Sequence, residues 1–253
     1  MMDRKFVLIT GGSRGECLAF KVSFRLLQLL INIVTQGIGK SLLSTYLSRP
    51  NYTAIAALRD PNTSSSKELE TLPCGKNSEL ILVKLDSSSE DDACAAVKTF
   101  VSEHHIQKLD IVVANAGISA YLGKATVTPV HEIFEHFEVN TVTPLLLFQS
   151  TNFLLNAASI PKFVIISSGA GSLSGVENLP VENTAYGTSK AGVNFVMRRI
   201  HYENPNLIAF SINLGWFQTD LGNHTAIGIG MVVAPVPIQD GVNGVIEQIG
   251  VPT

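Results

Sequence analysis

Tyr186 and Lys190 are the two residues of this 253-residue chain whose types and spacing point most directly to acid–base chemistry. They are four positions apart near the start of a segment with helical periodicity, so both side chains project from one face of the expected helix. A phenol with an ordinary pKa of about 10 transfers protons poorly at neutral pH, and a neighbouring ammonium lowers that pKa by stabilising the phenolate. Many surface helices carry such a pair, so whether this one is catalytic depends on the elements that surround it.

A glycine-rich segment that could bind phosphate follows the first apolar run of the chain. It reads TGGSRG over residues 10–15 and should pass directly into a helix whose first amides face a pyrophosphate. The helix-opening GIGK, residues 37–40, comes only after an apolar insert over residues 15–36. The residues predicted to contact the nucleotide in the two parts of this motif are Gly11, Ser13, Arg14, Gly15, Gly37, Ile38 and Gly39.

The insert over residues 15–36 interrupts an otherwise complete motif. Deleting these 22 residues restores TGGSRGIGK without any other change. Residues 15–17, Gly-Glu-Cys, can be encoded by GGTGAGTGC, which contains a splice-donor sequence, and whole codons keep the reading frame. We interpret the insert as a translated, unspliced intron; the alternative is a genuine insertion that forms an extra amphipathic helix.

Six short apolar runs alternate with longer segments of helical periodicity, as in parallel sheets covered on both faces. Right-handed crossovers place the strands' carboxyl ends at one edge, where ligands bind at the topological switch point. The sequence therefore predicts a single Rossmann-type α/β domain over residues 1–253: a doubly wound parallel sheet in three layers, α/β/α. The expected strands are 6–10, 53–59, 79–86, 109–117, 162–168 and 207–215, and the expected helices are 39–49, 88–105, 129–156 and 184–204.

Charge and composition favour a small-molecule partner over nucleic acid or a membrane. The formal charge is −3, and no basic run carries interleaved aromatics. The three cysteines are widely spaced without a CxxC pair, and the six histidines, His131 and His136 included, are expected at the surface, so no metal site is predicted. The apolar stretch 26–34 falls short of the ~20 residues that span a bilayer, and no signal peptide is recognisable, which favours a cytoplasmic protein.

The ordered motifs together resemble the short-chain dehydrogenase/reductase family. The glycine turn, ANAG at residues 114–117, Asn140, a serine pair before YxxxK and a glycine turn after the sixth strand each follow the expected element. The segments VVANAG, PLLLFQ and KFVIISSGAGS further resemble the fungal branch that includes norsolorinic acid ketoreductase. The resemblance covers nearly all of the chain outside the insert.

The resemblance implies an oxidoreductase that interconverts a ketone and a secondary alcohol by hydride transfer, in fungal polyketide metabolism. Tyr186 would protonate the carbonyl oxygen, and Lys190 would also hold the nicotinamide ribose. Ser168 would hydrogen-bond the substrate oxygen, with Ser167 as the alternative, and Asn140 would anchor a water of the proton relay.

Two arginines bear on the choice of cofactor. Arg59 follows the second strand, where NAD enzymes usually carry an acid, and Arg14 lies in the glycine turn. Guanidinium groups suit a 2′-phosphate, so NADP(H) is predicted, with two solvated arginines as the alternative. The resemblance adds further cofactor-binding residues, namely Asp86, Asn115, Ala116, Gly117, Gly215 and Thr219 beside Tyr186 and Lys190.

Some features depart from the family pattern. The usual Pro-Gly after the sixth strand is Leu214-Gly215 here, and no β-rich segment follows residue 240, so we expect a truncated sheet edge. The alternative to an active carbonyl reductase is a catalytically inactive relative with a binding role only.

The substrate and the oligomeric state are less defined by the sequence. The variable pocket walls are expected at 119–130, 169–184 and 216–235, and the apolar stretch GIGMVVAPVPI, which starts in the last of these, suits a flat or apolar ketone. A homodimer or homotetramer would pair through the helices at 129–155 and 184–203.

Overall fold

The computed structural model describes residues 5–10, 37–58, 60–84, 95, 98–99, 101–115 and 117–250, with backbone alone for 5–10 and 57. Six strands form one sheet in the order β3-β2-β1-β4-β5-β6, and every neighbouring pair is parallel. This confirms the predicted doubly wound α/β fold. The strands are β1 Lys5–Thr10, β2 Tyr52–Leu58, β3 Glu79–Lys84, β4 Ile111–Ala114, β5 Lys162–Ser167 and β6 Ile208–Asn213.

The described centre of the sheet is apolar and buried. All four residues of β4 are buried, and Val112 lies in register between Leu8 of β1 and Phe163 of β5. β-Branched and aromatic side chains suit strands covered on both faces. The strand order reverses between β1 and β4, which makes the carboxyl ends of these strands the topological switch point of the fold.

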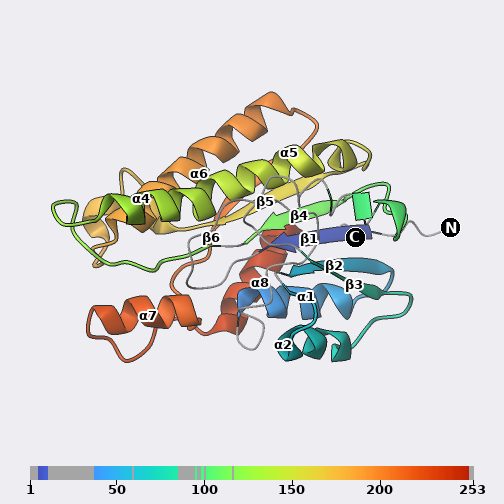
Figure 1. Cartoon of the computed structure of the whole chain (residues 1–253), viewed down its shortest axis with the longest axis horizontal. Coiled ribbons are helices and arrows are strands. Elements are labelled where there is room, and N and C mark those ends of the chain that lie inside the picture. The colour runs from blue at the N-terminus through green and yellow to red at the C-terminus, as the bar shows by residue number, and fades with distance from the viewer. Residues whose placement is uncertain are drawn as a thin grey trace.

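Helices cover both faces of the sheet, as three layers require (Figure 1). On one face, α1 packs against α8, and α1 buries Leu42, Leu43, Tyr46 and Leu47, a stripe with helical spacing. The other face carries α4, α5 and α6. The helices are α1 Ile38–Leu47, α2 Ser64–Lys67, α4 Val130–Phe137, α5 Thr143–Leu155, α6 Thr184–Glu203, α7 Asp220–Gly228 and α8 Ile238–Ile249.

The segment expected as one helix over 129–156 is two helices joined by a wide, π-helical turn, Glu138–Val142. Pro144, at the start of α5, gives the physical reason, because it has no amide hydrogen to donate to the carbonyl of Asn140 four residues earlier. Its ring also crowds that carbonyl, and one widened turn relieves the conflict. Asn140 therefore lies in the widened turn.

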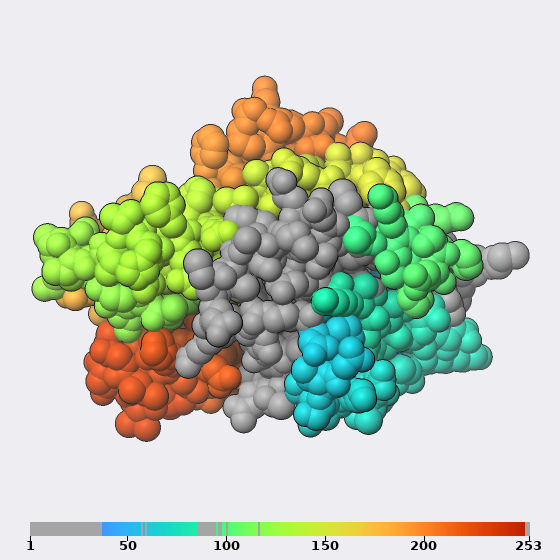
Figure 2. Space-filling model, viewed as in Figure 1, coloured from blue at the N-terminus to red at the C-terminus, as the bar shows by residue number. Residues whose placement is uncertain are grey.

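α7 was not anticipated from the sequence. Its first turn is capped by Thr219, whose hydroxyl accepts a hydrogen bond from the Gly222 amide at 3.0 Å. Gly228 at its end approaches Leu122 in the segment after β4, and Figure 2 shows the two regions adjacent at one edge of the molecule. The insert over 15–36 and most of the helix expected at 88–105 lie outside the described residues. No helix in the described part of the chain is long and apolar enough to cross a membrane.

Candidate active site

A cavity of about 810 Å³ opens where β4, β5 and β6 end and α1 begins. The switch point of a doubly wound sheet is where such folds bind ligands. Most of the predicted site residues that the structure describes meet here. Those that line the cavity are Ile38, Gly39, Asn115, Gly117, Ser168, Tyr186, Lys190, Gly215 and Thr219.

Ser168 is the serine that the structure pairs with Tyr186. It directly follows β5, accepts a hydrogen bond from the Ala170 amide at 3.1 Å, and makes a side-chain hydrogen bond with Tyr186. Ser167 also lines the cavity, but its hydroxyl donates to Oδ1 of Asn194 at 2.7 Å. The local geometry thus favours Ser168 over Ser167 at this position.

Lys190 lies one helical turn after Tyr186 and is almost completely buried. Its Nζ donates a hydrogen bond to the Ile166 carbonyl at 2.9 Å and lies 5.6 Å from the centroid of the Tyr186 ring. Burial lowers the pKa of Lys190 to about 8 and raises the pKa of Tyr186, since both charged forms lose solvation. Burial is the larger effect on the pKa of the phenol, and the hydrogen bond with Ser168 opposes it. The expected lowering of that pKa by the ammonium stays a prediction, because Nζ is directed to the Ile166 carbonyl.

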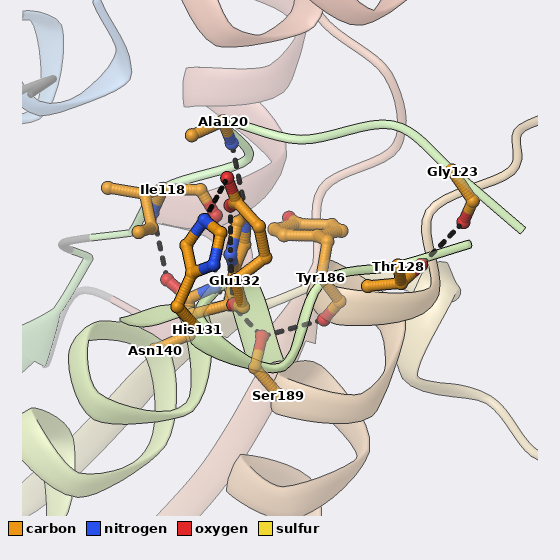
Figure 3. A network of polar contacts seen from close by, with 10 residues as sticks. Ile118, Ala120, Gly123, Thr128, His131, Glu132, Asn140, Tyr186 and Ser189 are labelled. Carbon is orange, nitrogen blue, oxygen red and sulfur yellow. Dashed lines mark hydrogen bonds and ion pairs between the residues drawn. The ribbon is translucent and has the colours of Figure 1, made fainter. Parts of the chain in front are cut away.

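Asn140 connects three parts of the site from a fully buried position. Its Nδ2 donates to the Ile118 carbonyl and to the Ser189 hydroxyl, both at 2.9 Å, and its Oδ1 accepts from the Ile118 amide at 2.8 Å (Figure 3). Ser189 in turn donates to the backbone carbonyl of Tyr186 at 2.7 Å. Both amide protons of Asn140 are therefore bonded to protein atoms, and the predicted contact with a water is not tested.

Two glycines of the site have steric reasons to be glycine. A Cβ on Gly117 would lie 3.1 Å from Oδ1 of Asn140 and 3.4 Å from Nζ of Lys190, a tight fit against two groups held by other bonds. Gly215 adopts φ +90°, a conformation that side chains strongly disfavour. Thr219, near Gly215, uses its hydroxyl to cap α7.

The start of α1 is suited to an anion. Gly37 is the extended N-cap and offers no side chain to the first amides, while Ile38 and Gly39 line the cavity. Free amides at a helix N-terminus bind phosphate groups, so this end of the cavity fits the pyrophosphate of a dinucleotide. The other predicted cofactor contacts lie outside the described residues: Gly11, Ser13, Arg14, Gly15, Arg59, Asp86 and Ala116.

The structure adds residues that sequence reasoning missed. His136 is fully buried and not at the surface as expected, because it lies four residues before Asn140 on the side of α4 that faces the cavity-lining segment. The four-residue spacing between His136 and Asn140 was the sequence feature that could have predicted this burial. Asp60, Ser119, Ala120 and Glu135 also line the cavity. Among the described residues no group of acidic, histidine and cysteine side chains could hold a metal ion.

The three variable segments each reach the cavity. Segment 119–130 contributes Ser119 and Ala120, 169–184 contributes Leu179 to Val181 among others, and 216–235 contributes residues between Trp216 and Thr225. The apolar stretch 228–238 is absent from the described lining, and Val232 within it is 92% exposed. We expected this stretch to form an apolar wall of the cavity, and that expectation is wrong.

The chain is similar in sequence to proteins of a known family. The sequence model of the short chain dehydrogenase family matches residues 28–227. This chain belongs to that family. A norsolorinic acid ketoreductase of Dothistroma septosporum is 38% identical over 223 residues, which are 87% of this chain and 83% of that protein. The short chain dehydrogenase gsfK of Penicillium aethiopicum is 39% identical over 219 residues, 85% of this chain and 76% of that protein.

Solved structures show the same short-chain dehydrogenase fold. The NADPH-bound carbonyl reductase from chicken fatty liver superposes with a TM-score of 0.69 at 23% identity, covering 91% of this chain and 90% of that one. As a member of this family, the protein is an oxidoreductase. Its sequence is similar to those of fungal ketoreductases.

Proposed function

We propose that this short-chain dehydrogenase is an NADP(H)-dependent reductase that converts a ketone to a secondary alcohol. The observation that carries the proposal is the convergence of Ser168, Tyr186 and Lys190 on a cavity that begins at the N-terminus of α1. The similarity to norsolorinic acid ketoreductases supports an aromatic ketone of fungal secondary metabolism as the substrate class.

The chemistry follows from the positions of the three side chains. A bound nicotinamide cofactor supplies the hydride that reduces the carbonyl carbon. The Tyr186 hydroxyl gives its proton to the carbonyl oxygen, so that the C=O bond becomes CH–OH. Ser168 donates a hydrogen bond that polarises the same oxygen, and the positive charge of Lys190 stabilises the phenolate left on Tyr186. Asn140 fixes the backbone that leads to these groups.

Preference for NADP(H) rests on Arg14 and Arg59, which lie outside the described residues. Asp60, immediately after Arg59, lines the cavity and accepts a hydrogen bond from the Asn62 amide at 2.8 Å. Its carboxylate is thus engaged in a local turn, which leaves the guanidinium of Arg59 as the proposed partner of a 2′-phosphate. Titrating NADPH and NADH in parallel, following nucleotide fluorescence, tests this: equal affinities would contradict the preference.

The insert in the phosphate turn favours a second candidate, a protein that lacks cofactor binding and catalysis. The decisive experiment compares the chain as given with a version lacking residues 15–36. Both are titrated with NADPH and then supplied with aromatic ketones, with Tyr186→Phe as the inactive control. Binding and turnover by the deleted version alone would show that the insert blocks a working reductase, as a retained intron would. Binding by neither version would leave the non-catalytic role.

Self-association through α4, α5 and α6 forms part of the proposal. Large apolar side chains are exposed there, including Phe134 and Phe195, each at 69%. Isolated exposed hydrophobics are common, but several on adjacent helices suit a symmetric interface. Light scattering should give a dimer or tetramer, and Phe134→Ser combined with Phe195→Ser should shift the mass toward the monomer.

A further inference from the structure

His136 has no place in the proposed chemistry, yet it is fully buried beside the cavity. It is held by backbone groups of two segments. Its Nε2 accepts a hydrogen bond from the Ala120 amide at 3.0 Å, and its Nδ1 lies 2.7 Å from the carbonyl oxygen of Glu132. An amide can only donate and a carbonyl can only accept, so Nε2 carries no proton and Nδ1 carries one. A single neutral tautomer satisfies both bonds.

The segment that His136 holds is part of the cavity wall. Ile118, Ser119 and Ala120 all line the cavity directly after Gly117. At the first of these residues the backbone amide and carbonyl are both bonded to Asn140, and at the third the amide is bonded to His136. Figure 3 shows Ile118 and Ala120 on one stretch of chain beside Asn140 and Glu132.

His136 and Asn140 are four residues apart on consecutive turns of α4 and the widened turn, so their side chains extend from one face. The two residues that hold the cavity wall, His136 and Asn140, therefore both belong to the continuous segment formed by α4 and the widened turn. Ala120 itself is exposed, but its amide is bonded to a fully buried imidazole, so this end of the segment is tied to the interior.

We infer that His136 is a positioning residue: its neutral imidazole fixes the cavity-lining segment Ile118–Ala120 at its far end, as Asn140 fixes it at its near end. The consequence for catalysis rests on the proposed function. A wall that is fixed beside Tyr186 holds the ketone in line with the phenol, whereas the phosphate end of the cavity, at α1, is independent of His136.

The test compares His136→Leu, which removes the acceptor, with His136→Gln, whose side-chain oxygen can take the place of Nε2. His131→Leu is the matched control, because His131 lies on the same helix and, like His136, has a ring nitrogen 3.6 Å from a Glu132 carboxylate oxygen, but its side chain is 75% exposed. Circular dichroism first checks that each variant folds.

Amide hydrogen exchange of the full chain without substrate reports on the bond itself. In His136→Leu the peptide that contains Ala120 should exchange about tenfold faster, while His136→Gln and His131→Leu should match the wild type. Equal acceleration in His136→Leu and His136→Gln, or none in either, would overturn the inference. This readout needs no turnover, so it remains decisive if the proposed reductase activity is not found.

Kinetics then separate positioning from general damage. The KM for the ketone should rise about tenfold in His136→Leu, with a smaller change in kcat, an unchanged Kd for NADPH and recovery in His136→Gln. Faster Ala120 exchange with an unaltered KM would show that the bond does not position the substrate. A weakened NADPH affinity in His136→Leu would also contradict the inference, since the effect would then extend to the α1 end.

Discussion

The hydroxyl of Ser189 donates a hydrogen bond to the backbone carbonyl of Tyr186 at 2.7 Å. The same oxygen accepts a hydrogen bond from Nδ2 of Asn140 at 2.9 Å. Ser189 is fully buried, so one hydroxyl joins the first turn of α6 to the widened turn before α5. The position of the proposed catalytic tyrosine therefore depends on a contact with a residue far earlier in the sequence.

Replacing Ser189 by alanine should destabilise the protein more than its small volume suggests. The substitution leaves one amide proton of Asn140 buried without an acceptor, which costs about 1–3 kcal/mol. Urea denaturation followed by circular dichroism measures this loss. Thr188→Ala, at the exposed neighbouring position of α6, is the control and should change stability little. Equal effects of the two substitutions would contradict the predicted role of Ser189.

Removing the phenol hydroxyl should separate binding from turnover. Tyr186→Phe should lower kcat between about 100-fold and about 10,000-fold, the usual contribution of a general acid, while NADPH binding persists. Ser168→Ala should reduce kcat less, because the hydrogen bond to the oxygen is lost but the proton donor remains. Steady-state kinetics with one ketone, together with NADPH titration, check both. Turnover by Tyr186→Phe at the wild-type rate would rule out this tyrosine as the proton donor.

Lys190 should leave a signature in the pH dependence of stability. Burial lowers its pKa from 10.5 to about 8, so between these values the unfolded chain binds the proton more tightly than the folded chain. The free energy of unfolding therefore gains a contribution from Lys190 as pH rises above 8. Relative to Lys190→Met, the wild type should gain about 2 kcal/mol between about pH 7.5 and about pH 9.5. Urea denaturation of both proteins at the two pH values tests this, and a difference that stays constant with pH would contradict the lowered pKa.

Gly117 and Gly244 should respond in opposite ways to alanine. At Gly117 a Cβ presses against Asn140 and Lys190, so alanine should lower both Tm and kcat. At Gly244, within α8, the added Cβ meets no atom within 4 Å from other elements in the described part of the chain, and alanine should stabilise the helix by about 0.5–1 kcal/mol. Thermal denaturation compares the two variants directly. A stabilised Gly117→Ala would mean that the neighbouring groups move aside freely.

The strands could be predicted because their information is local. Each of the six is a run of apolar or β-branched residues, such as Ile111–Ala114, and the structure contains all six within a few residues of the expected bounds. The break between α4 and α5 was missed although Pro144 was visible, because the apolar periodicity continues through it. The start of α6, with Tyr186 and Lys190 one turn apart, was correctly predicted from the sequence.

The contacts of the site could not be predicted to the same extent, since they join distant parts of the chain. Burial of His136 depends on an amide 16 residues earlier, and the choice of Ser168 over Ser167 depends on where Asn194 lies in α6. Spacing placed Tyr186 and Lys190 on one face, but only the fold shows that the ammonium is directed to the Ile166 carbonyl. Periodicity identifies elements, and the packing between them decides which polar atoms meet.

The widened turn at Asn140 has a consequence for how the molecule forms. It follows from the missing amide hydrogen of Pro144, a covalent property of the chain that needs no partner from elsewhere in the fold. As soon as the segment 130–155 becomes helical during folding, its asparagine is already set apart from the regular spiral. Ile118 and Ser189 then bond to an asparagine whose place outside the regular helix is already set by the proline ring.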